Sequence, residues 1–261
     1  MKLYSKKELI RKLKKISSKG WIPNARHGNH GGIGNTLEDL LGIDENNLPI
    51  PNASEWELKA QRINSSSLTT LFHMEPSPRA IKFVPQVLLP KYGWKHEKAG
   101  AKYPKNEMSF RQTIHGANPS DRGFMVKINR RQKKVLISFE SSMVSARHAN
   151  WLNSVKKVIG LGKLRPQPYW GFNDLEHKVG VKLLNCFYVQ AEVKKESGRE
   201  FYYYKKALML EGFDFKKFLK AIEKSKILVD FDARTGHNHG TKFRLRQNCL
   251  PMLFKKSVVL F

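Results

Sequence analysis

A glutamate and a lysine two residues apart, Glu57 and Lys59, are the pair in this sequence most suited to chemistry. Hydrolysis of a phosphodiester needs a divalent cation to stabilise the developing charge and lower the pKa of a water, and a group that orients this water. On a strand the two side chains share a face and lie ~6–7 Å apart, so the carboxylate can hold the cation while the ammonium contacts water or phosphate. Surface strands also carry Glu-x-Lys without any catalytic role, so the pair alone does not establish a site.

The segment around the pair has the pattern of a strand. Residues 55–60 alternate polar and apolar side chains, as a strand with one buried face does. We expect Trp56 and Leu58 to face the core, and Glu57 and Lys59 to face the other way.

A second short strand is predicted over 68–72. His73 follows it directly, and Pro76 and Pro78 end regular structure soon afterwards. His73 is therefore expected at a strand end.

The charge of the chain is its outlying bulk property. Its 48 lysines and arginines against 22 aspartates and glutamates give a net charge of +26, which repels itself unless a polyanion relieves it. Nucleic acid is the favoured partner. Because there is no apolar run of 18 residues and no signal-peptide pattern at the N-terminus, secretion and membrane insertion are disfavoured. Cys186 and Cys249 fit two buried thiols in a reducing cytoplasm.

Two helices are predicted near the N-terminus. Ser5 and Glu8 form a capping-box pattern, and apolar residues then recur at helical spacing until Gly20. Residues 28–34, GNHGGIG, are too rich in glycine for a helix, so we expect Asn35 or Thr36 to cap a short helix after them. This turn lacks the lysine of a nucleotide-binding P-loop.

The rest of the chain indicates mostly β-structure. Residues 91–123 are predicted as loops or short strands, and a helix is predicted after Asp214. The other predicted elements are a hairpin over 124–128 and 135–139, a long hairpin over 179–193 and 201–210, and strands over 227–231 and 243–245 around a polar loop.

Four ordered segments resemble the MvaI/BcnI restriction endonucleases, which are similar in fold to the mismatch-repair nicking enzyme MutH. The segments are 31–42, 55–59, 68–73 and 237–244. The resemblance runs from the first helix to the last strand and is loosest over about 95–170. It implies the α/β (α+β) restriction-endonuclease fold of the PD-(D/E)xK superfamily, a mixed β-sheet flanked by helices, with two lobes forming a DNA cleft.

The resemblance also implies an organisation and an activity. A single nuclease domain over 1–261 would comprise a catalytic lobe, about 1–90 plus central strands, and a recognition lobe, mainly about 165–261. The activity implied is that of a monomeric, Mg²⁺-dependent Type II enzyme of the bacterial cytoplasm. It would cut double-stranded DNA at a five-base-pair CC-x-GG-like site and act beside a cognate DNA methyltransferase.

Carried over by position, Glu57 is a metal-binding carboxylate, Lys59 the catalytic lysine and Glu38 a supporting acid. At the remaining metal-ligand position this sequence has Asn52 in place of the expected aspartate. An amide removes one negative charge, so Mg²⁺ binding and catalysis should both be weaker. A natural enzyme could have lost activity or moved the ligand to Glu55. A deliberate Asp→Asn replacement would leave every other motif intact, and we favour it for that reason.

Candidate DNA-reading residues lie in the C-terminal segment. Recognition of G·C pairs calls for Arg, Lys or His donors aimed at guanine O6 and N7, and this segment offers His237, His239, Lys242 and Arg244. By resemblance, Arg244 contacts a base, Lys242 lies next to the central pair and would suit a C·G or G·C centre, and His73 approaches that pair from the minor groove. The two C-terminal histidines could instead suggest zinc, but the sequence has no third ligand close to them.

Two other functions remain open from the sequence. A strand-nicking endonuclease of the MutH kind would use the same site. A non-catalytic, sequence-specific DNA-binding module would explain Asn52 as a natural loss.

Overall fold

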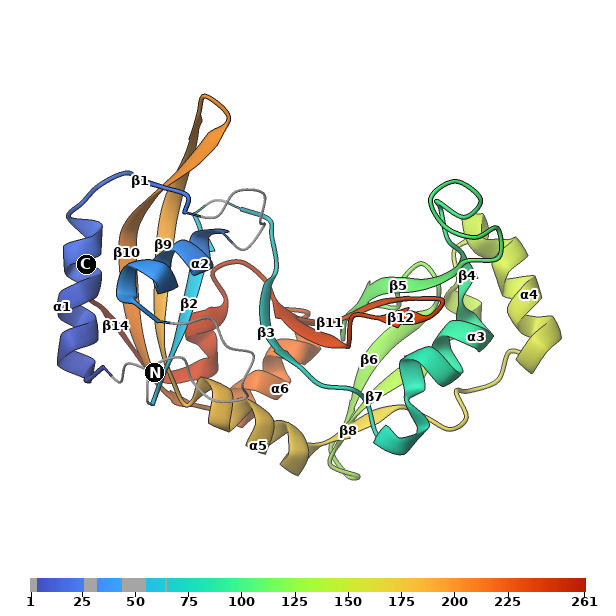
Figure 1. Ribbon diagram of the computed structural model, residues 1–261. Coiled ribbons are helices and arrows are strands. Elements are labelled where there is room, and N and C mark those ends of the chain that lie inside the picture. The colour runs from blue at the N-terminus through green and yellow to red at the C-terminus, as the bar shows by residue number, and fades with distance from the viewer. Residues whose placement is uncertain (1–3, 26–31, 44–54, 64) are drawn as a thin grey trace. The chain divides into compact units, whose positions relative to one another are not determined.

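The computed structural model describes residues 4–25, 32–43, 55–63 and 65–261. Asn52 and the glycine-rich residues 28–31 therefore lie outside the described residues. The chain forms two units, drawn in Figure 1 and considered separately below. The first unit comprises Met1–Thr69, Glu176–Lys217 and Gln247–Phe261, and the second comprises Thr70–Leu175 and Phe218–Arg246.

A mixed five-stranded sheet forms the centre of the first unit. Its order is β1-β10-β9-β2, and β14 also pairs with β10. The strands are β1 (Ile22–Pro23), β2 (Trp56–Arg62), β9 (Asn185–Glu196), β10 (Arg199–Phe213) and β14 (Phe254–Val259). β2 runs parallel to β9, whereas the other pairs are antiparallel. The long β9–β10 hairpin confirms the sequence prediction of a turn at Gly198.

Two helices pack on this sheet, α1 (Lys6–Ser17) and α2 (Gly32–Leu41). The predicted capping box is present, since the Ser5 side chain accepts from the backbone of Glu8 and the Glu8 carboxylate accepts from the backbone of Ser5. The core beneath the helices joins apolar side chains of α1 and α2 to Trp56, Leu58 and Tyr204 of the sheet. This packing fixes one face of β2.

Two sequence predictions in this unit are wrong in their boundaries. α2 begins at Gly32 rather than after Asn35 or Thr36. A Cβ on Gly32 would lie 2.6 Å from the Tyr202 hydroxyl oxygen, so glycine serves close packing there and not a turn. Residues 179–183, predicted as strand, belong to α5 (Phe172–Leu183), because Leu175, Val179 and Leu183 recur at helical spacing and are all fully buried.

The second unit contains a six-stranded and a three-stranded sheet, ordered β3-β13-β11-β5-β4 and β6-β7-β8, with β12 paired to β11. The strands are β3 (Thr69–His73), β4 (Trp94–Lys95), β5 (Met108–Ile114), β6 (Phe124–Asn129), β7 (Lys134–Phe139), β8 (Tyr169–Gly171), β11 (Ile227–Arg234), β12 (His237–Asn238) and β13 (Lys242–Leu245). The β6–β7 hairpin, β3, β11 and β13 confirm their predictions.

The remaining helices are α3 (Leu89–Tyr92), α4 (Ala149–Ile159) and α6 (Phe215–Glu223). Asp214 caps α6 as expected, since its carboxylate accepts from the Lys217 backbone at 3.1 Å. Within the residues that the structure describes, no helix has the length and apolar character needed to cross a membrane.

Candidate functional site

The predicted pair lies on β2, the last strand in the order of the first unit's sheet, and on the face opposite Trp56 and Leu58. In the parallel register Glu57 is beside Cys186 of β9 and Lys59 is beside Tyr188. Glu57 is only 1% exposed, so the expectation that this face of the strand points away from the interior is wrong. Other parts of the chain cover the polar face of β2 as well, so the carboxylate of Glu57 is shielded from water.

Two ammonium groups hold the buried carboxylate of Glu57. Lys59 Nζ lies 2.8 Å from Oε1, and Lys182 Nζ lies 3.4 Å from Oε2. Lys182 comes from α5, and its side chain, like that of Lys59, is largely covered. A buried charge is stable only when it is paired, and here one carboxylate faces two cations.

The pKa of Lys59 shows the balance at this centre. Burial by itself lowers that pKa, but the charge and hydrogen bond of Glu57 outweigh it, with smaller contributions from Cys186 and Glu38, and the pKa is raised. Lys59 is thus a cation at neutral pH and serves as a donor, not as a general base. The charge of Glu38, the third predicted residue of this centre, thus acts on Lys59, although less strongly than that of Glu57.

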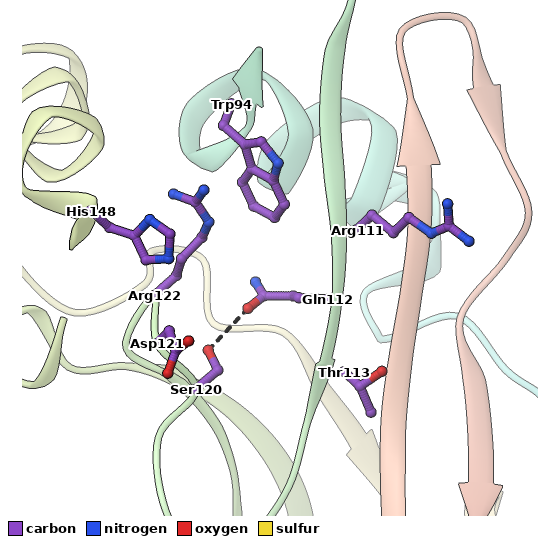
Figure 2. A pocket seen from close by; sticks show the side chains of 8 residues that line it. All are labelled: Trp94, Arg111, Gln112, Thr113, Ser120, Asp121, Arg122 and His148. Atoms are coloured by element: carbon purple, nitrogen blue, oxygen red, sulfur yellow. Dashed lines mark hydrogen bonds between the residues drawn. The ribbon is translucent and has the colours of Figure 1, made fainter. Parts of the chain in front are cut away.

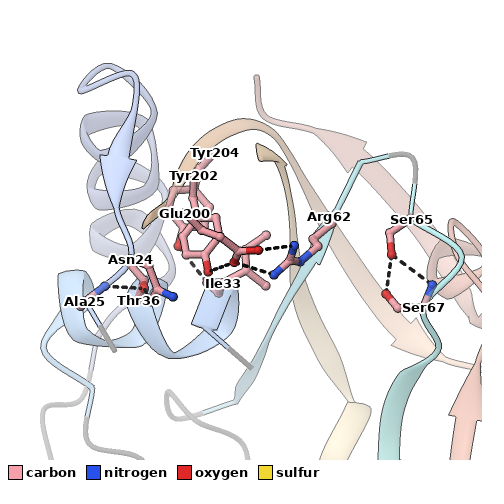
Figure 3. A network of polar contacts seen from close by, with 10 residues as sticks. All are labelled: Asn24, Ala25, Ile33, Thr36, Arg62, Ser65, Ser67, Glu200, Tyr202 and Tyr204. Carbon is pink, nitrogen blue, oxygen red and sulfur yellow. Dashed lines mark hydrogen bonds and ion pairs between the residues drawn. The ribbon is translucent and has the colours of Figure 1, made fainter. Parts of the chain in front are cut away.

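The helix carrying Glu38 is held to the sheet by a polar network (Figure 3). The Tyr204 hydroxyl donates to the Ile33 carbonyl at 2.8 Å, and the Thr36 hydroxyl donates to Asn24 Oδ1 at 3.3 Å. At the end of β2, Arg62 forms two hydrogen bonds with Glu200, of 3.0 and 2.8 Å. These bonds raise the pKa of Arg62 and lower that of Glu200.

The donors present fit a hard divalent cation. Glu57 Oε2 is buried and accepts no hydrogen bond from the described residues, although the ammonium of Lys182 is close to it. Carboxylate oxygens are the ligands that Mg²⁺ prefers. Within the described ranges no three His, Cys, Asp or Glu side chains gather where they could hold a metal. The other predicted ligand, Asn52, lies outside the described residues.

The thiol of Cys186 adds no reactive group. Burial, and then the charge of Glu57, raise its pKa well above the ordinary range, so the thiol stays protonated. Sequence reasoning missed other neighbours on this face: Gln61 and Tyr188, which are hydrogen-bonded to each other, and Lys182. Alternation along β2 already places Gln61 on this face, but only the β2–β9 pairing brings Tyr188 close, and only the position of α5 brings Lys182 close.

In the second unit the carboxylate of Glu75 lies at the turn that follows the predicted histidines His237 and His239. Glu75 Oε1 accepts from the Thr241 backbone at 2.8 Å, and Oε2 accepts from its hydroxyl at 3.0 Å, which fixes the turn before β13. A Cβ on Gly240 would lie 3.6 Å from the His73 ring. His237 and His239 are exposed, with ring centroids 4.2 Å apart. His73, at the end of β3 as predicted, therefore lies beside this turn.

Lys242 and Arg244 project from the same face of β13, and each faces an acid of β11. Arg244 Nη1 lies 3.3 Å from Asp230 Oδ2, and Lys242 Nζ lies 3.9 Å from Asp232 Oδ2. Two residues of β5, Thr113 and Arg111, contact the same two acids. The Thr113 hydroxyl donates to Asp230 at 2.7 Å.

The other β5 residue, Arg111, lies 3.4 Å from Asp232. We call this row of side chains, together with the predicted histidines, the recognition surface, after the DNA-reading role expected from the sequence for the histidines, Lys242 and Arg244. It consists of His73, Arg111, Thr113, Asp230, Asp232, His237, His239, Lys242 and Arg244. It displays both donors and acceptors, which is the combination needed to read the edges of base pairs.

Comparison with known proteins gives a consistent result. The chain is similar to the solved structure of restriction endonuclease MvaI in complex with its cognate DNA substrate, with a TM-score of 0.76 and 25% identity over 99% of this chain and 100% of that one. The structure of MvaI without DNA gives a TM-score of 0.56 at 25% identity, with all of both chains covered.

No match is found among curated protein sequences. The model of the MvaI/BcnI restriction endonuclease family matches residues 10–254. Nearly the whole sequence is thus accounted for, from the first helix to the last strand, and the chain belongs to the MvaI/BcnI restriction endonuclease family.

Proposed function

We propose that this restriction endonuclease hydrolyses phosphodiester bonds of double-stranded DNA with Mg²⁺, at a CC-x-GG-like site. The observation that carries the proposal is the buried Glu57 carboxylate between Lys59 and Lys182 in a chain of a nuclease family. We infer that the first unit is the catalytic lobe and the second the recognition lobe. The enzyme would act as a monomer in the bacterial cytoplasm, with a cognate methyltransferase protecting the host DNA.

In this proposal each residue of the centre has its own task. Glu57 and the residue at position 52 hold the cation, which, when bound, stabilises charge on the phosphate and acidifies a water. Lys59, cationic at neutral pH, donates to the scissile phosphate or to the attacking water. Glu38 supports Lys59 electrostatically. Lys182 offsets charge that develops on the phosphate, because its ammonium is already directed at the same centre.

Asn52 would make this sequence a weak catalyst. A neutral amide in place of a carboxylate removes one of the charges that attract Mg²⁺, while binding of DNA does not depend on it. The chain as written would therefore bind its site and cut it slowly. A deliberate replacement accounts best for one changed ligand in an otherwise intact centre.

Reversion of Asn52 tests this proposal. Asn52→Asp should produce Mg²⁺-dependent cutting of supercoiled plasmid, with a nicked intermediate before linear DNA, because a monomer has one active site for two strands. Asn52→Ser is the matched control and should stay inert. Nicked product that never becomes linear would indicate a nicking enzyme. Tight binding without cutting by the revertant would indicate a non-catalytic module.

Specificity is tested by binding the four possible central pairs. We propose that Lys242 favours guanine at the centre, since a lysine donor suits guanine O6 and N7, and that His73 approaches the pair from the minor groove. Duplexes with C·G or G·C centres should bind the chain more tightly than those with A·T or T·A centres. Preference for A·T centres would refute this assignment of Lys242.

A further inference from the structure

The second unit contains a cavity of about 330 Å³ that the proposed function does not use. It lies beside β5, the loop before β6 and the start of α4, and Figure 2 shows the side chains around it. Its polar walls include Gln112, Ser120 and Arg122, and one aromatic wall is Trp94. The following contacts define what could bind there.

Arg122 is a partly buried cation whose faces are covered by indole rings. Its guanidinium carbon lies 4.0 Å from the ring centre of Trp94 and 4.8 Å from that of Trp151. Stacking leaves only the edge of a guanidinium for hydrogen bonds. Nη1 on that edge is buried and makes no hydrogen bond to the described residues. The neighbouring acid, Asp121, is paired with Arg147 instead.

Gln112 brings a second donor to the cavity. The Phe124 backbone donates to the Ser120 hydroxyl at 3.2 Å, so this hydroxyl in turn donates to Gln112 Oε1, at 3.0 Å. This bond sets the orientation of the Gln112 side-chain amide. Its Nε2 is buried and has no hydrogen-bond acceptor in the described part of the chain. Leaving a buried donor unsatisfied is costly. Burial also lowers the pKa of Arg122.

The cavity adjoins the recognition surface. Arg111 and Thr113 line it, and they also contact Asp232 and Asp230, the acids that face Lys242 and Arg244. The side chain of Gln112 alternates with those of Arg111 and Thr113 on β5 and is directed into the cavity (Figure 2), so a group bound there would lie across β5 from DNA read at β13.

We propose that this cavity binds a phosphate group, and that its source is a backbone phosphate of the DNA next to the bases read by the recognition surface. This inference rests on the proposed function. A phosphate supplies several acceptor oxygens and a negative charge, which would satisfy both the Gln112 amide and the Arg122 edge. A neutral base could accept hydrogen bonds but would leave the guanidinium charge uncompensated.

The first test measures binding of cognate duplex to the full chain at several salt concentrations. Arg122→Gln should weaken binding roughly 10- to 100-fold, as loss of a charge-assisted hydrogen bond does. The slope of log K against log salt is negative, and its magnitude should decrease by about 0.9, the value for one phosphate. Replacing single phosphates of the duplex with neutral methylphosphonates should then reveal one or two positions that weaken wild-type binding but have little effect on the variant.

A second variant separates this role from a structural one. Gln112→Glu keeps the size of the side chain and adds a negative charge to the cavity that Arg122 lines, so the melting temperature should hold or rise. DNA binding should nevertheless weaken, because the new carboxylate repels phosphate. Both variants binding DNA with the affinity and salt slope of wild type would overturn the proposal, and so would an Arg122→Gln effect that is equal for every methylphosphonate position.

Inorganic phosphate and deoxycytidine monophosphate probe the free-ligand source through the fluorescence of Trp94 and Trp151. Weak millimolar binding that Arg122→Gln abolishes would support a phosphate site made for DNA. Micromolar binding of the nucleotide would overturn the backbone assignment in favour of a free nucleotide. A chain that bound phosphate but no DNA would contradict the proposed function and leave the cavity as a phosphate site.

Discussion

The acids of the two candidate sites, one in each unit, lie in opposite environments. In the first unit one carboxylate, Glu57, is almost fully buried and has two lysines on it. In the second unit Asp230 and Asp232 remain partly accessible, and each shares its charge with a cation of β13. Charges interact strongly where water is excluded and weakly where it is not. The first arrangement suits one reaction at a fixed point, whereas the second suits contacts exchanged with a partner.

Replacement of Lys59 should have the largest effect of all, on the rate of DNA cleavage. In an Asn52→Asp background, Lys59→Met should lower the cleavage rate by about 10³-fold or more, because a donor aimed at the developing charge is lost in a site shielded from water. Single-turnover cleavage of a cognate duplex measures it. Lys205→Met is the matched control, since Lys205 pairs with Glu192 on an exposed part of the same sheet, and its rate should stay within about twofold. An equal loss in both variants would mean that overall charge matters, not the buried centre.

Replacement of Lys182 should change the cleavage rate and its dependence on Mg²⁺ in different ways. Lys182→Gln in the same background should slow cleavage at saturating Mg²⁺ about 10-fold, because one cation near the phosphate is lost. The Mg²⁺ concentration for half-maximal rate should fall, since Lys182 no longer occupies Glu57 Oε2. A Mg²⁺ titration of the cleavage rate separates these effects. A merely structural role would lower activity without a shift in the Mg²⁺ midpoint.

The recognition surface should respond in affinity and specificity. Arg244→Gln should weaken cognate binding by about 1–3 kcal/mol and relax the preference at one G·C pair. Asp230→Asn should have a smaller effect, because Arg244 keeps its charge but loses the acid that orients it. Titrations with cognate and singly substituted duplexes measure both. Uniform weakening on every duplex would instead indicate that Arg244 contacts phosphate.

The smallest effect concerns stability. The hydrogen bonds from Arg62 are the main reason that the pKa of Glu200 is lowered in the folded protein. The ionised Glu200 therefore adds to the free energy of unfolding above the ordinary pKa of 4.5, and this contribution is lost as the pH falls through the folded-state pKa. Glu200→Gln should cost about 1 kcal/mol at pH 7, and the difference from wild type should shrink below about pH 4. Urea unfolding at both pH values tests this, with Glu196→Gln as the exposed control. A constant difference across pH would refute the charge assignment.

Local signals in the sequence determined a good part of the fold. The capping box at Ser5, the turn at Gly198 and the cap at Asp214 all appear as predicted, because each depends on hydrogen bonds or dihedral angles within a few residues. Spacing along β2 likewise placed Glu57 and Lys59 on one face. The resemblance to the restriction endonuclease family rested on motifs that the sequence itself carries.

Tertiary structure alone decided the environment of those residues. β2 pairs with β9, a strand far along the chain. This pairing buries Glu57, gives it polar neighbours on β9 and lets Lys182 contact it. Position 32, the first residue of α2, needs glycine because the hydroxyl of Tyr202 packs against it. Residues 179–183 are helical because their apolar face has a core to cover. Short-range periodicity contains no information about such partners, and it is these long-range contacts that turn a Glu-x-Lys pair into a charged centre shielded from water.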